Sequence, residues 1–82
     1  MHAKIAVPEW RALAAHVDEP GLRAEAEAMA DRLARLDEDA ERLARAEYDL
    51  TQRLITLGGW KPTASRQLQR LNSEAARVIQ GE

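Results

Sequence analysis

LRAEAEAMADRLARLDEDAERLARAEYDLTQRLITL, residues 22–57, has an apolar residue at every seventh position. A second set of residues, four positions after each of these, is apolar except at Glu47. A seven-residue repeat of this kind is typical of a helix that packs lengthwise against other helices. It predicts one long helix over residues 20–57, whose repeat covers about 54 Å. The seam residues expected to mediate self-association are Leu22, Met29, Leu33, Leu36, Leu43, Leu50 and Leu54.

A short helix is predicted ahead of the long one, over residues 8–17. Pro8 fits the first turn of a helix and disfavours helical geometry in the residue before it. Residues 1–7 are therefore predicted to form an extended tail. Trp10 shares one helix face with Leu13 and Val17, and we expect it in the core.

The sequence LGGWKPTAS, residues 57–65, interrupts the helical pattern and predicts a turn. Gly58 and Gly59 allow the positive φ angles of a left-handed helix stop, and Pro62 prevents the helix from continuing. A third helix over residues 63–80 is then expected to run back antiparallel to the long helix. The residues expected to cap the helices are Asp18 for the long helix and Thr63 or Ser65 for the third.

The fold class predicted from these patterns is all-α: a short N-terminal helix followed by a long antiparallel helical hairpin of the coiled-coil type. A chain of 82 residues forms one domain with a thin core, and the absence of cysteine excludes a disulfide scaffold. The third helix is too short to cover the whole seam of the long one. We therefore predict that residues 1–82 form a single helical domain that associates into a homodimer.

The composition favours a cytoplasmic protein. The formal net charge is −2, and the chain has neither an apolar run that would span a membrane nor the features of a signal peptide, so no membrane partner is expected. Ten arginines against two lysines, together with sixteen alanines, suggest a GC-rich genome, and hence a bacterial or phage origin.

Residue types that perform chemistry are sparse. His2 and His16 are the only histidines, and a zinc site needs three or four ligands. No serine or threonine has a base at a characteristic spacing, and no glycine-rich loop follows a strand. We therefore predict a protein that is not an enzyme and that uses no cofactor, metal ion or small-molecule substrate.

Trp60 is the most prominent side chain in the predicted turn. The indole either folds back onto Leu57 and Leu68, which removes its apolar surface from water, or stands out beside Lys61 as an anchor for a partner. The sequence leaves both alternatives open.

Charged residues form three further groups. Arg66, Arg70 and Arg77 return to one side of the third helix, as a solvated face or as a contact with an acidic protein surface or with phosphates. Glu47 is expected at a partly solvated edge of the seam, or paired with Arg66 or Arg70. The acidic cluster is expected as a solvated face of the long helix, or as a patch that meets a basic partner, and it consists of Asp37, Glu38, Asp39 and Glu41.

Three functions are compatible with these features. The first hypothesis is a non-enzymatic protein-interaction module, such as an adaptor, assembly factor or small inhibitor, that binds an unidentified protein through Trp60, Lys61, Arg66, Arg70 and Arg77. The second is a nucleic-acid-binding regulator or terminase-like oligomer that uses the arginines of the third helix. The third is a structural coiled-coil spacer. Charge ranks the first ahead of the second, because the long helix is acidic and would repel a nucleic acid.

Overall fold

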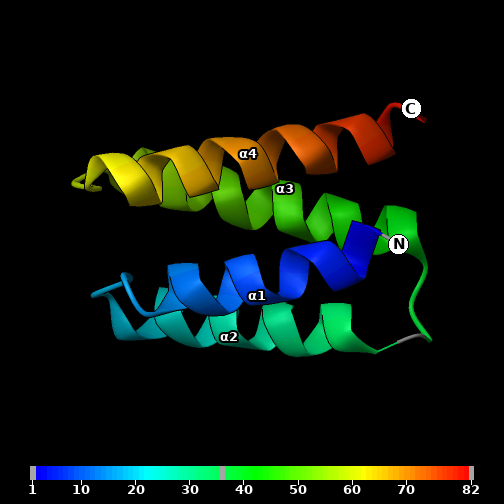
Figure 1. Ribbon diagram of the computed structural model, residues 1–82, viewed down its shortest axis with the longest axis horizontal. Coiled ribbons are helices and arrows are strands. Elements are labelled where there is room, and N and C mark those ends of the chain that lie inside the picture. The colour runs from blue at the N-terminus through cyan, green and yellow to red at the C-terminus, as the bar shows by residue number, and fades with distance from the viewer. Residues whose placement is uncertain (1, 36, 82) are drawn as a thin grey trace. The chain divides into compact units, whose positions relative to one another are not determined.

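The structure, a computed structural model, describes residues 2–35 and 37–81. These residues form four helices, α1 (His2–Ala14), α2 (Pro20–Ala34), α3 (Ala40–Leu57) and α4 (Pro62–Ile79), and no strand. The all-helical class predicted from the sequence is confirmed. The chain divides into two units, Met1–Glu38 and Asp39–Glu82. In the first unit α1 packs against α2, and in the second α3 packs against α4 (Figure 1).

The single long helix predicted over residues 20–57 is wrong. α2 ends at Ala34 and α3 begins at Ala40, so the seven-residue repeat passes over a five-residue break without losing its phase. Three consecutive acidic residues, 37–39, lie in this break. Carboxylates are unfavourable at the negative C-terminal end of a helix and favourable at the start of the next one, which places the boundary here. The predicted seam residue Leu36 lies outside the described residues.

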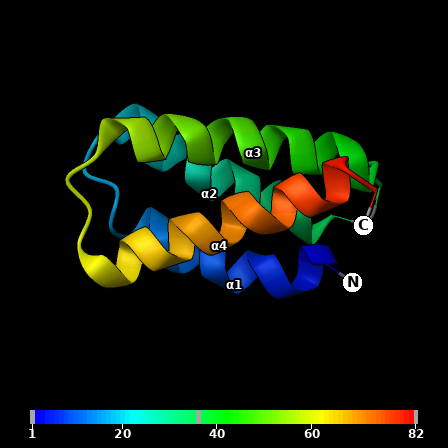
Figure 2. The same cartoon turned by 90° about the horizontal axis from the view of Figure 1, so that it is seen from above.

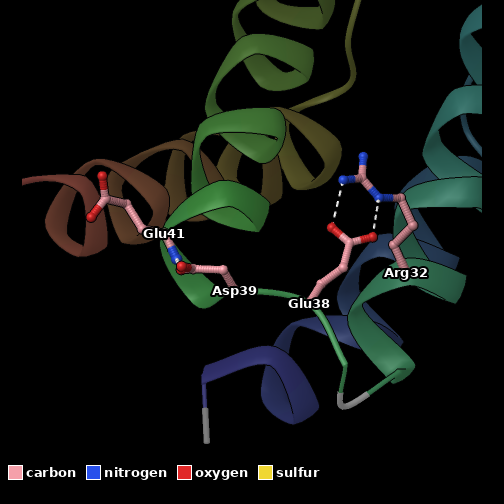
Figure 3. A network of polar contacts seen from close by, with 4 residues as sticks. All are labelled: Arg32, Glu38, Asp39 and Glu41. Carbon is pink, nitrogen blue, oxygen red and sulfur yellow. Dashed lines mark hydrogen bonds and ion pairs between the residues drawn. The ribbon is translucent and has the colours of Figure 1, made fainter.

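Two polar contacts fix the ends of this break (Figure 3). On the α2 side, Arg32 donates from Nε and Nη2 to the two carboxylate oxygens of Glu38, at 3.1 and 2.7 Å. The pKa of the Arg32 guanidinium is raised above its usual value because it donates these hydrogen bonds to Glu38. On the α3 side, the carboxylate of Asp39 accepts a hydrogen bond of 2.8 Å from the backbone N–H of Glu41 and caps the helix.

The extended tail predicted for residues 1–7 is wrong for the described part of that range, because α1 already begins at His2 and contains Pro8 in its interior. A proline at this position removes one helical hydrogen bond. The turn ahead of it nevertheless packs, since Ala6 is fully buried and lies on the same face as Trp10. Trp10 itself is fully buried, as expected from the sequence.

The cap at the start of α2 is Glu19, and the prediction of Asp18 is wrong. The carboxylate of Glu19 accepts hydrogen bonds from the backbone N–H groups of Gly21 at 2.7 Å and Leu22 at 2.9 Å. Pro20 occupies the first helical position, where its missing N–H costs nothing. The side chain of Glu19 is longer than that of Asp18 and lies one residue nearer the helix, so its carboxylate reaches two of the unpaired N–H groups.

The helices of the second unit lie side by side and run in opposite directions, with residues 58–61 joining them at one end (Figures 1 and 2). A side-chain hydrogen bond joins them two thirds of the way along α3: the side-chain amide of Asn72 in α4 donates to the hydroxyl of Thr51 at 2.9 Å. The buried stripe of α4 has the predicted spacing and consists of Ala64, Leu68, Leu71 and Ala75.

The turn between α3 and α4 depends on two glycines. Gly58 has φ 76° and ψ −171°, and Gly59 has φ 78°. The positive φ angles agree with the sequence, but the extended ψ of Gly58 belongs to a region that is essentially restricted to glycine, outside the left-handed helical one. α4 then begins at Pro62, so Lys61 takes the cap position without a side-chain hydrogen bond and the predicted caps Thr63 and Ser65 are wrong.

We predict that Asp39→Ala destabilises the start of α3 by about 1 kcal/mol, because the helix loses its cap. Amide hydrogen exchange should accelerate in residues 41–44. Asp37→Ala removes the same charge from an exposed neighbouring residue and serves as the control, with exchange expected to stay at the parent rate. Equal protection in the two variants would show that the cap does not hold the boundary.

We predict that Gly58→Ala lowers the free energy of unfolding by about 1–3 kcal/mol, because an L-residue is strained at this φ and ψ. A Cβ atom at this position meets nothing within 4 Å, so the effect is one of backbone strain alone. The matched control, made by chemical synthesis, carries D-alanine at position 58, which adds the same methyl group but tolerates positive φ. Urea denaturation should show the loss for L-alanine only, and similar losses for both would exclude backbone strain as the cause.

Candidate interaction site

Trp60 folds back onto the last turn of α3. Its indole Nε1–H donates to the backbone carbonyl oxygen of Leu54 at 2.7 Å, and the backbone N–H of Gly58 approaches the same oxygen at 3.4 Å. The last carbonyls of a helix lack some of their partners within the helix, and here the indole gives the Leu54 oxygen a second and shorter hydrogen bond beside that from the Gly58 backbone N–H. Trp60 as a whole is partly buried and keeps some contact with water.

Leu57 lies beside this turn and is exposed over 54% of its surface. It follows Leu50 by seven positions and Leu54 by three, and both of those residues are buried. The apolar stripe of α3 therefore continues to the end of the helix, beyond the part that is covered. Leu57, Trp60, Lys61 and Pro62 together are called the turn site below, and Lys61 and Pro62 are exposed.

The three arginines predicted as a binding face all lie on α4 and are exposed. They are opposite the buried stripe, as their spacing predicts. They do not gather at one place, however. Arg66 is one helical turn from the start of α4, whereas Arg77 lies in its last turn, where a cation is favourable near the helix C-terminus. Of the predicted binding residues, Lys61 belongs to the turn site and Arg66 lies four residues after it.

The predicted self-association seam is largely inside the protein. Leu22 is half-buried, and Leu36 lies outside the described residues. The other seam residues are at most 4% exposed, and they are Met29, Leu33, Leu43, Leu50 and Leu54.

Glu47 is fully buried, so the expectation of a partly solvated position is wrong. Its pairing with Arg66 or Arg70 stays a prediction. One turn further on, Thr51 is also fully buried, and its hydroxyl hydrogen-bonds the backbone carbonyl of Glu47 at 2.9 Å in addition to its bond with Asn72. Sequence reasoning missed Thr51, because the seven-residue repeat indicates only where apolar residues recur.

The acidic cluster does not form one face of a helix. Glu38 is bound by Arg32, Asp39 caps α3, and Glu41 accepts a hydrogen bond from Arg45 at 3.0 Å. Each carboxylate thus has a local partner on its own side of the break between α2 and α3.

Other kinds of site find no support in the described residues. Within residues 2–35 and 37–81, no three His, Cys, Asp or Glu side chains are placed to hold a metal ion. No helix in this part of the chain is long and apolar enough to cross a membrane. Comparisons of the chain with protein-family models, with curated proteins and with solved structures found no match. The turn site is therefore the feature of the described residues that bears on function.

We predict that Trp60→Ala lowers the free energy of unfolding by about 2 kcal/mol, of which the lost hydrogen bond accounts for about 1 kcal/mol and the half-buried ring for the rest. Replacing the indole by benzothiophene, which keeps the ring shape but lacks the N–H, should cost only about 1 kcal/mol. Urea denaturation measures both values. A benzothiophene variant as stable as the parent would mean that the bond to Leu54 does not stabilise the turn.

Proposed function

We propose that this protein is a non-enzymatic protein-interaction module, an adaptor, assembly factor or small inhibitor, that binds a partner protein through the turn site. The observation that carries the proposal is the exposure of Leu57, three residues before the partly buried Trp60, at the end of a helix pair. Neighbouring apolar and aromatic side chains at a surface are typical of binding sites, and tryptophan is enriched among the residues that dominate binding energy.

The hydrogen bond of the Trp60 indole to Leu54 favours a role in binding. Its N–H already has an acceptor in Leu54, so a partner that covers the ring leaves no donor without a hydrogen bond. The same bond restricts the orientation of the ring, and less side-chain entropy is lost when a partner binds. Trp60 therefore has a structural role and a proposed binding role at once.

Self-association and a cytoplasmic location are part of the same proposal. The described seam residues from Met29 to Leu54 are buried, so the seam offers little apolar surface to a second copy. The turn site has such surface, and a homodimer that forms through it is one form that the proposed interaction can take.

A nucleic-acid-binding regulator is the second candidate, and the exposed Arg66, Arg70 and Arg77 favour it. Three arginines spread along one helix make few phosphate contacts. The salt-dependent affinity of a protein for nucleic acid grows with the number of such contacts. Protein binding has the stronger support, because an exposed leucine contributes to an apolar interface and gains nothing from phosphates.

Binding through the turn site is tested by photo-crosslinking followed by affinity measurement. The chain, with p-benzoylphenylalanine in place of Lys61, is expressed in its own host, and the crosslinked protein is identified by mass spectrometry and purified. We predict that Leu57→Gln weakens its affinity at least tenfold, because burying a leucine contributes about 1.5 kcal/mol or more.

Tyr48→Gln is the matched control, since Tyr48 is an exposed apolar residue of the same helix, 37% exposed, in the part of α3 away from the turn. Its affinity for the partner should equal that of the parent. Light scattering on the same samples reports whether the partner is a second copy of the chain. Equal affinities of the two variants, or crosslinks to nucleic acid alone, would contradict the proposal.

A further inference from the structure

The half of the α3–α4 pair that contains the turn is free of acidic residues. The hydrogen bond between Asn72 and Thr51 marks where the two helices lie level with each other, so residues 51–72 make up the half on the turn side. This half carries four cations and no Asp or Glu. The other described residues of the unit, 39–50 and 73–81, carry five carboxylates and three arginines. A chain with a net charge of −2 thus places a uniformly basic region around its exposed apolar turn.

One of these cations, Lys61, belongs to the turn site, and a second, Arg66, lies four residues after it. Lys61 follows Trp60 directly, and Arg66 lies one helical turn into α4; both are exposed. Within the described part of the chain, neither has an ion-pair partner. Arg53, by contrast, lies 3.5 Å from the carboxylate of Asp49 on its own helix. Lys61 and Arg66 are thus exposed cations within six residues of Trp60 in the sequence.

We propose that the turn site recognises an acidic, amphipathic segment of its partner protein. An apolar side chain of that segment packs on Leu57 and Trp60, and carboxylates on its flanks pair with Lys61 and Arg66. The inference rests on the proposed function and adds the chemistry of the partner to it. Complementary charge around an apolar contact steers association and selects among partners.

Other anions fit this surface less well. A nucleic acid gains affinity from several phosphate contacts, and the turn site has a single aromatic side chain, Trp60, on which a base can stack, whereas Leu57 gains nothing from a base. A lipid surface needs a larger group of basic residues, since clusters of four to eight are typical of binding to anionic membranes. Of the four cations in residues 51–72, Lys61 and Arg66 are the two for which the described residues provide no ion-pair partner. A protein segment satisfies the apolar and the charged groups together.

The partner chemistry is tested by selecting random 12-residue peptides, displayed on phage, against the full chain at about 0.15 M salt. Selected peptides should contain an aromatic or aliphatic residue flanked by Asp or Glu and have a negative net charge. Synthetic copies should lose at least tenfold in affinity for Leu57→Gln and keep their affinity for Tyr48→Gln. Selected peptides with no excess of acidic residues would overturn the inference.

Charge reversal provides an independent measurement. The double variant Lys61→Glu/Arg66→Glu should bind the acidic peptides at least tenfold more weakly, and the loss should shrink as the salt concentration rises. Lys61 occupies the start of α4, where a carboxylate is favourable, so this variant is expected to fold. The control Arg42→Glu/Arg45→Glu makes the same change of charge on exposed residues of α3 outside residues 51–72, and its affinity should stay near that of the parent. Equal effects of the two double variants would overturn the inference.

The outcomes separate this inference from the proposed function. Peptides that depend on Leu57 but carry no acidic bias leave the proposed function in place and overturn the acidic partner. Peptides that bind without dependence on Leu57 overturn both. Vesicles containing phosphatidylglycerol and a single-stranded oligonucleotide serve as competing probes. Sub-micromolar binding of either one, sensitive to Lys61→Glu/Arg66→Glu, would replace the acidic segment by a lipid surface or a nucleic acid.

Discussion

Every helix has backbone N–H groups at its start and carbonyl groups at its end that find no partner inside the helix, and the arrangement of this chain follows from where they are satisfied. Glu19 and Asp39 supply carboxylates to the starts of α2 and α3. At the end of α3 the short-range donor is a side chain, the indole of Trp60. The helix boundaries, the break between the two units and the form of the turn all depend on these groups.

The sequence predicted well which residues are apolar and buried, and predicted poorly where the helices end. A seven-residue period indicates which face of a helix is apolar. It does not reveal a break in the helix when the apolar residues on both sides keep the same spacing. The five residues between Ala34 and Ala40 are such a break, because Met29 and Leu43 remain fourteen positions apart. The acidic residues 37–39 did indicate a helix boundary, because acidic side chains are unfavourable at the end of one helix and favourable at the start of the next.

The candidate site was predicted in part. The turn itself, its glycines and its exposed lysine follow from local chemistry, since glycine and proline restrict the backbone in known ways. The exposure of Leu57 does not, because its position in the repeat matches that of buried residues. Nor does the bond from Trp60 to Leu54, which requires the loop to return across six residues. A periodic pattern describes one helix face, and the position at which a neighbouring helix stops covering that face is a property of the folded pair.

The two tryptophans are divided between the two units, and this gives the protein a spectroscopic reporter for each of them. Trp10 belongs to the first unit and is fully buried, whereas Trp60 belongs to the second and is in contact with water. Emission from a buried indole lies at shorter wavelength than emission from a solvated one, so the intrinsic fluorescence of the chain is the sum of two distinguishable signals. Changing either residue to phenylalanine leaves a probe of a single unit. Whether the two helix pairs unfold in one transition or in succession is therefore readable from the chain's own fluorescence, without an added label.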